Sequence, residues 1–214
     1  MKYRHIIWDW NGTLFNDAWL CVEVMNGVLS RRHMALLTPD RYMDIFDFPV
    51  VDYYRRLGFD FEKESFQISG TEFIVEYNKR YREPTLHQGA RSTLQAVKDA
   101  GVTQSILSAQ EQFTLDELME IHNMQPFLLK AIGLNDHYAH SKIENGLAWM
   151  KELHYGSHEV LFVGDTVHDH EVAEAIGADC VLIPGGHHSR TKLEKTGVPV
   201  LNDLSQLVDW IKQQ

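Results

Sequence analysis

Residues 4–13 constrain the fold more than any other segment, because they end a short apolar run in a carboxylate and then turn sharply. The apolar residues 6–8 suit a buried strand, and Asn11-Gly12 ends that strand just after Asp9. In open α/β sheets, ligands bind beyond the carboxyl ends of the strands, which is where Asp9 would lie. A strand followed by an ordinary turn explains the same residues, since Asp and Asn-Gly are common turn formers.

From residue 84 onward, strand and helix patterns alternate. The expected strands cover residues 102–107, 128–132, 159–163 and 180–183, with a last strand around Val198. A helical pattern that ends at Gly101 precedes the first of these strands, and further helical patterns lie between them. Alternating βα units imply a parallel sheet that is covered on both faces. The sequence therefore predicts an α/β fold with a Rossmann-like parallel sheet core.

Residues 16–83 show no strand pattern and form one helical block. Apolar residues recur there at spacings of three and four, as in Leu20, Cys21, Val24, Met25 and Val28. We expect Asn16 or Asp17 to cap this first helix, Pro39 to open another, and a further helix to run to about Arg82. The predicted division is a core of residues 1–15 and 84–214 with an all-helical cap of residues 16–83 inserted after the first strand.

Charge and cysteine content limit the partners and the compartment. The formal net charge of −10 argues against sequence-independent binding to nucleic acid or to an anionic membrane. An anionic ligand would need a metal ion, a few cations or backbone N–H groups to hold it locally. Cys21 and Cys180 lie far apart, and no segment reaches membrane-spanning length. We expect a cytoplasmic protein without a signal peptide.

A second strand end repeats the pattern of the first. Residues 160–163 run into Gly164-Asp165-Thr166, and Asp169 follows four residues after Asp165. At a strand-to-helix turn these two acids could face a shared cation, and their hard oxygen ligands suit Mg²⁺. Capping of the helix N-terminus explains the same pair, so both interpretations stay open.

Two further polar residues stand where they could join these acids. Ser108 ends the expected strand of residues 102–107 and offers a hydroxyl at the corresponding position. Lys142 begins a helix behind the expected turn at residues 135–138, where its ammonium could hold both Asp9 and a phosphoryl oxygen. A lysine at the start of a surface helix is equally common.

The order of these motifs resembles the haloacid dehalogenase-like hydrolase superfamily, and within it the phosphoglycolate phosphatase branch. The motifs are Asp9-Trp-Asn11-Gly12-Thr13, the strand-end Ser108, Lys142, and Gly164-Asp165-Thr166-Val-His-Asp169. The resemblance covers nearly the whole chain, because residues 16–83 fall where one subgroup inserts its cap. It implies a Mg²⁺-dependent hydrolase of a small phosphorylated metabolite.

The resemblance also implies residue roles. Asp9 would be the nucleophile that forms an aspartyl-phosphate, and its other oxygen would bind Mg²⁺ together with the backbone carbonyl of Asn11. Asp165 and Asp169 would complete the metal site directly or through water. The implied substrate contacts are Gly12, Thr13, Ser108, Ala109, Lys142 and Arg55. Metal, lysine and backbone donors suit phosphoryl transfer, because the transferred group carries negative charge on its oxygens.

Position 11 departs from the family pattern, which has a second aspartate there to protonate the leaving group and later deprotonate water. An amide can do neither. The chain could still hydrolyse phosphoesters, with His168, His170 or Glu171 as a substitute base. It could instead favour acyl phosphates or phosphoanhydrides, whose leaving groups need little protonation. It could also bind a phosphorylated ligand without turnover.

The cap and the histidines supply further candidates. Phe46, Phe48 and Pro49 could form an apolar lip, while Arg41, Arg55 and Arg56 could meet a second anionic group or simply be solvated. Lys63 would be the nearest Schiff-base lysine for a phosphonate-cleaving reaction, a weaker alternative. Most of the twelve histidines are expected at the surface, with His187 and His188 near the cap hinge.

Overall fold

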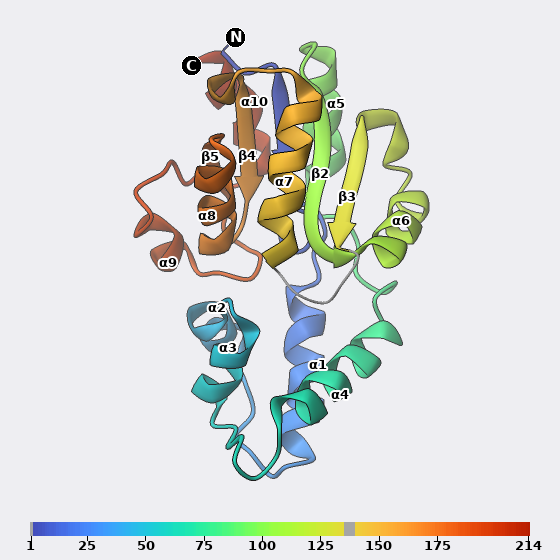
Figure 1. The fold of residues 1–214 in the computed structure, drawn as a ribbon, viewed down its shortest axis with the longest axis vertical. Helices are drawn as coiled ribbons and strands as arrows, with labels where there is room; N and C mark the ends of the chain where they lie inside the picture. The colour runs from blue at the N-terminus through green and yellow to red at the C-terminus, as the bar shows by residue number, and fades with distance from the viewer. Residues whose placement is uncertain (1, 135–139) are drawn as a thin grey trace.

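The computed structural model describes residues 2–134 and 140–214, which form an α/β core and a helical body below it (Figure 1). The strands are β1 (His5–Trp8), β2 (Thr103–Glu111), β3 (Lys130–Leu134), β4 (Val160–Gly164) and β5 (Asp179–Leu182). They pair in parallel in the order β3-β2-β1-β4-β5. The predicted α/β fold with a parallel sheet is confirmed.

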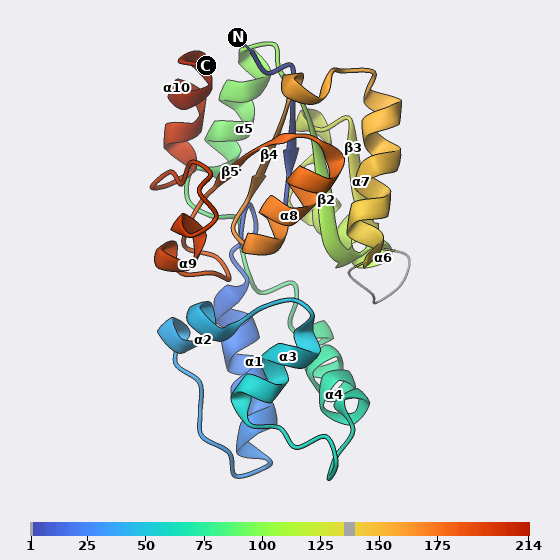
Figure 2. The ribbon, with the colours of Figure 1, turned by 60° about the vertical axis from the view of Figure 1, so that its left-hand side comes forward.

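Strand β1 lies at the centre of the sheet, and its alternating side chains serve two cores. Ile6 and Trp8 belong to one apolar cluster and Ile7 to another, as the two-residue period of a strand requires. Helices α5 (Ala90–Asp99), α6 (Gln112–Ile121) and α10 (Leu207–Lys212) cover the first face, and α7 (His140–Leu153), α8 (Val167–Ile176) and α9 (Arg190–Glu194) contribute to the second. The sheet is therefore covered on both faces (Figure 2).

Four helices make up the body that faces the carboxyl ends of the strands (Figure 1). They are α1 (Ala18–Ser30), α2 (Pro39–Ile45), α3 (Val50–Leu57) and α4 (Phe66–Asn78). Their apolar side chains form a core of their own, which includes Met25, Tyr42 and Tyr54. Two linkers join this cap to the sheet, and they run side by side, because Phe15 and Leu86 form an antiparallel bridge.

Several expected boundaries differ from the structure. The strand expected around Val198 is reduced to one bridge between Leu182 and Val200, because Pro199 has no N–H with which to extend a ladder. Helix α4 ends at Asn78, before Arg82. The turn expected at residues 135–138 lies outside the described residues. Where the chain is described, no helix combines the length and apolarity needed to cross a membrane.

Candidate active site

Asp9 and Lys142 form a buried ion pair at the carboxyl end of β1. Lys142 comes from the first turn of α7, and its Nζ lies 2.5 Å from Asp9 Oδ1 and 2.7 Å from Asp169 Oδ1. The three side chains are almost inaccessible to solvent. One ammonium thus joins two acids that the sequence places 160 residues apart, and the expected contact between Lys142 and Asp9 is present.

Asp169 caps the start of α8, as one of the two interpretations of its sequence position predicts. Its Oδ2 accepts a hydrogen bond of 2.9 Å from the Thr166 backbone N, and its own backbone N donates one of 3.2 Å to the Thr166 hydroxyl, which together form a capping box. The Thr166 hydroxyl also donates to Asp169 Oδ2 at 2.7 Å. Its Oδ1 is turned to Lys142. Helix capping therefore fixes the carboxylate so that its other oxygen faces Lys142.

Asp165 is held by hydrogen bonds to the turn that follows β1 and to the loop that follows β5. Its Oδ1 accepts a hydrogen bond of 2.7 Å from the Thr13 hydroxyl, and its Oδ2 accepts one of 2.6 Å from the backbone N of His187. Gly12 and Gly186 pass so close that a Cβ on either would overlap the Asp165 carboxylate, and Gly12 also has a φ of +76°. Only glycine suits these two positions.

Asp9, Asp165 and Asp169 could hold a metal ion together. Each offers one oxygen, and these oxygens lie within 4.8 Å of one another. Burial raises the pKa of Asp9 and of Asp165, and neighbouring carboxylates raise both further. Lys142 lowers the pKa of Asp9 in part, and His187 does the same for Asp165. Burial also raises the pKa of Asp169, but Lys142 and Thr166 outweigh it and hold that pKa below its ordinary value. The cluster is therefore short of positive charge, and its hard oxygen donors suit Mg²⁺.

Asn11 uses its side-chain amide to connect neighbouring segments. Its Nδ2 donates to Asp17 Oδ2 at 2.9 Å, and its Oδ1 accepts from the Ser108 hydroxyl at 3.3 Å. Ser108 lies within β2 instead of following it, and its Oγ accepts a hydrogen bond of 3.0 Å from the Gln110 backbone N. The amide ties the turn after β1 both to β2 and to the start of the cap.

Asp17 is the site residue that the sequence interpretation missed. It occupies the N-cap position of α1, but its side chain makes no capping bond there. Instead it accepts hydrogen bonds from the Gly12 backbone N at 3.0 Å and the Tyr77 hydroxyl at 2.7 Å, and it lies 3.4 Å from His187 Nε2. Burial raises the Asp17 pKa, but His187, Asn11 and Tyr77 outweigh burial and hold it below its ordinary value. Its closeness in sequence to Asp9 was the one available signal.

A cavity of about 320 Å³ lies between the strand ends and the cap. Asp9, Asn11, Ala109, Lys142 and Asp169 line its core side. Tyr42, Phe46, Phe48, Phe73 and Tyr77 are among the cap residues that line the other side. The expected apolar lip therefore includes Phe46 and Phe48. Gly12 and Thr13 lie behind this surface, where they position Asp165 and Asp17.

The cap cations expected near the substrate lie elsewhere. Arg55 is exposed and pairs with Asp52 one turn earlier in its helix, and Arg56 pairs with Asp47 at 3.0 Å. The described lining of the cavity includes neither Arg55 nor Arg56, and it also lacks Arg41 and Lys63. Arg55 is therefore not placed where it could contact a ligand, because its helix presents it to solvent and to an acidic neighbour.

The histidines divide between the cavity and its surroundings. His168 lines the cavity, whereas His170 and Glu171 do not belong to its described lining, and Glu171 instead contacts His168 Nδ1 at 3.1 Å. His187 and His188 are buried instead of exposed. His187 Nδ1 lies 2.8 Å from the Tyr42 hydroxyl, and its Nε2 lies 3.4 Å from Asp17 Oδ1, so it contacts both α2 and the place where the first linker enters the cap.

Comparison with known proteins agrees with this architecture. A family model described as haloacid dehalogenase-like hydrolase matches residues 6–183. The phosphoglycolate phosphatase of Pseudomonas savastanoi pv. phaseolicola is 25% identical over 139 residues, which are 64% of this chain and 51% of that protein. The chain thus spans about half the length of the curated relatives it matches. The expected resemblance to this branch is confirmed.

Solved structures share the whole fold. A structure described as a predicted phosphatase from Clostridium acetobutylicum has a TM-score of 0.82 at 17% identity and covers 100% of both chains. A structure described as a predicted phosphoglycolate phosphatase from Haemophilus somnus has a TM-score of 0.79 at 15% identity and covers 99% of both. At these identities the likeness shows the fold alone.

Proposed function

Because this chain belongs to the haloacid dehalogenase-like hydrolase family, we propose that it is a phosphatase that transfers the phosphoryl group of a small phosphorylated metabolite to Asp9. One observation carries this proposal. Asp9 lies on the floor of the cavity, 2.5 Å from a buried lysine and beside two further carboxylates. The relatives named phosphoglycolate phosphatase support the same reaction class. We propose a cytoplasmic location with it.

Asp9 and Lys142 take part in both steps of the proposed reaction. An oxygen of the Asp9 carboxylate attacks phosphorus, the ester P–O bond breaks, and the leaving oxygen takes a proton from solvent water. A water molecule then attacks the phosphorus of the aspartyl-phosphate and gives up a proton to solvent, and the bond between Asp9 and phosphorus breaks, which releases inorganic phosphate and restores Asp9. Lys142 compensates negative charge on the transferred group, and burial strengthens that interaction.

The metal proposal rests on the carboxylate cluster. Asp9, Asp165 and the backbone carbonyl of Asn11 would hold Mg²⁺, with Asp169 acting directly or through water. When bound, the ion would supply the positive charge that the cluster lacks and lower the repulsion between carboxylate and phosphate. Thr13 and His187 orient Asp165 for this task, since each donates a hydrogen bond to one of its oxygens.

The test combines turnover with trapping of the intermediate. Phosphate release from a panel of phosphorylated metabolites should require Mg²⁺ and stop with EDTA. Asp9→Asn should abolish it, whereas Asp209→Asn, whose side chain is 80% exposed and distant in the fold, should not. Acid-quenched protein should carry phosphate on Asp9. Turnover that survives Asp9→Asn, or phosphate found on another residue, would refute the proposal.

A second candidate is favoured by Asn11. Both functional ends of its amide are engaged, one by Asp17 and one by Ser108, and neither can transfer a proton. The chain would then prefer acyl phosphates or phosphoanhydrides, or bind a phosphorylated ligand without turnover. Comparing acetyl phosphate with glucose 6-phosphate separates these cases. Equal rates exclude the preference for good leaving groups, and turnover of either compound excludes an inactive binder.

A further inference from the structure

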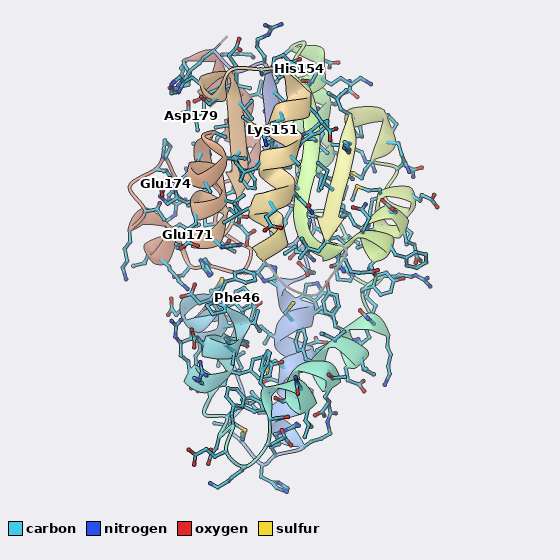
Figure 3. The ribbon with its side chains drawn as sticks, in the orientation of Figure 1. Phe46, Lys151, His154, Glu171, Glu174 and Asp179 are labelled. Carbon is cyan, nitrogen blue, oxygen red and sulfur yellow. The ribbon has the colours of Figure 1, made fainter. Side chains whose placement is uncertain are left out.

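The cap side of the cavity is built from aromatic and aliphatic side chains. The lining residues on this side include Tyr42 from α2, Phe46 and Phe48 after it, and Phe73 and Ile74 from α4. Figure 3 shows Phe46 at the level where core and cap meet. A cavity of about 320 Å³ is within the range of small-ligand pockets, roughly 300–1,000 Å³. The part of a ligand that lies beyond the phosphate would therefore contact apolar surface.

The cavity offers little to a second anionic group. The basic side chains in its described lining are Lys142, His168 and His187, and each already contacts a carboxylate. Asp17 and Glu111 add negative charge to the same lining. The sequence of residues 135–141 contains two histidines, His137 and His140, but no lysine or arginine. A carboxylate placed in the cap side would lose its hydration without gaining a free cation, which is costly.

Asn11, on the core side of the cavity, also limits the part of the substrate that lies beyond the phosphate. Without an acid at position 11, departure is fastest for a leaving group that is stable as an anion. A phenolate meets this condition better than an alkoxide, because its ring delocalises the charge. An aromatic ring also matches the apolar and aromatic lining in polarity.

We propose that the phosphorylated ligand of this protein carries an aromatic ring next to its phosphate, as in a phosphate ester of a phenol. This inference rests on the proposed function and narrows its substrate class. The phosphate lies at Asp9 and Lys142, and the ring lies against Phe46, Phe48 and Phe73. Phosphoglycolate, with its small charged leaving group, is then a poor substrate.

Three substrates and two inert analogues test this assignment. With Mg²⁺, phenyl phosphate should have the highest kcat/KM, benzyl phosphate the next and phosphoglycolate the lowest, with about tenfold or more between the first and the last. Benzyl phosphate is the control for reactivity, because it keeps the ring but has an alkoxide leaving group. Benzylphosphonate should bind about tenfold more tightly than phosphonoacetate by calorimetry.

A pair of substitutions on one helix locates the ring. Ile74 and Ile68 both lie on α4 and are 40% and 56% exposed, but only Ile74 belongs to the described cavity lining. Ile74→Arg should lower kcat/KM for phenyl phosphate and raise it for phosphoglycolate, which narrows their ratio about tenfold. Ile68→Arg should leave the ratio unchanged.

The outcomes separate this inference from the proposed function. Three results would each overturn the aromatic assignment and leave the proposed phosphatase intact. They are equal kcat/KM for phosphoglycolate and phenyl phosphate, equal affinity for phosphonoacetate and benzylphosphonate, and an unchanged kcat/KM ratio in Ile74→Arg. No turnover of any substrate, together with tight benzylphosphonate binding, would refute the phosphatase and keep the aromatic ligand.

Discussion

Asn11 and Asp17 form the contact that most distinguishes this site at the scale of single residues. The amide of Asn11 donates to the buried Asp17 carboxylate at 2.9 Å. A carboxyl group in place of this amide would face a second carboxylate at hydrogen-bonding distance, and two such groups share one proton because both cannot stay ionised. The environment at position 11 is thus already suited to keeping an acid protonated, although the chain has no acid there.

Asn11→Asp should therefore gain a proton donor. For a substrate with an alkoxide leaving group, such as benzyl phosphate, we expect kcat to rise about 10²-fold, at the lower end of the usual effect of general acid catalysis. Phenyl phosphate should gain less, because its leaving group needs less protonation. Steady-state kinetics on both substrates measures this, with Asn11→Ala as the control that removes the amide without adding an acid. An equal response of both substrates would show that position 11 does not act through proton transfer.

Asp17 should contribute strongly to stability, because it is buried and contacts several donors. Removing it by Asp17→Ala leaves the Gly12 N–H, the Tyr77 hydroxyl and His187 without their acceptor. We expect the free energy of unfolding to fall by about 3 kcal/mol in urea titrations. Tyr77→Phe, which removes only one donor, should cost about 1 kcal/mol. A loss in Asp17→Ala no larger than that in Tyr77→Phe would contradict this account.

At the scale of elements, the start of α8 links helix stability to the geometry of the site. Thr166→Ala removes the hydroxyl that both accepts from the Asp169 N–H at 3.2 Å and donates to Asp169 Oδ2. We expect a loss of about 1 kcal/mol in unfolding free energy, together with lower activity because Asp169 is less well oriented. Ser65→Ala is the matched control, since Ser65 occupies the N-cap of α4 without a side-chain capping bond. Equal losses in the two variants would show that the capping box is not the cause.

Local patterns at the strand ends were sufficient to predict the core of the site. Asp9 and Asp165 each follow an apolar run that ends in a tight turn, and parallel strands bring such ends to one edge. Contacts that depend on tertiary packing could not be predicted in this way. Asp17 has the sequence of a helix cap, and only the positions of Gly12, Tyr77 and His187 reveal its other role.

The same limit applies to the cap cations. An arginine in a helical cap is a reasonable candidate for a ligand contact. The direction of the Arg55 side chain, however, depends on the packing of α3, which presents it to solvent beside Asp52. The reduced strand near Val200 differs for a local reason, because the apolar residues there favour a strand but Pro199 lacks the N–H that a longer ladder needs.

At the scale of the whole molecule, the cap contacts the core at a third place besides its two linkers. The loop after β5 contacts α2, where Ser189 N donates to the Met43 carbonyl at 3.2 Å and His187 meets the Tyr42 hydroxyl. Lys192 in α9 pairs with Asp47 of the cap at 3.3 Å. The segment that positions Asp165 through His187 N therefore also holds the cap, so the metal cluster and the aromatic side of the cavity share one support.

The stability of the whole fold should depend on pH through His5, which lies at the end of β1 away from the site. Burial lowers the pKa of His5 from 6.5 to about 4, and its two ring nitrogens contact the Thr103 and Ser105 hydroxyls. Because the unfolded chain binds this proton more readily, the stabilisation is complete above pH 6.5 and is lost as the pH falls toward 4. Burial also lowers the pKa of His188, to about 3, so the loss of stability continues as the pH falls below 4.

Urea unfolding from pH 7 to pH 4 measures this dependence. Over that range the wild-type chain should lose about 3 kcal/mol more than His5→Gln, whose side chain cannot take up the proton. The exposed His154 supplies the control, because His154→Asn suits its left-handed backbone and should give a curve parallel to that of the wild type. If the curves of wild type and His5→Gln were parallel instead, the buried imidazole at position 5 would not be the group that couples proton uptake to unfolding.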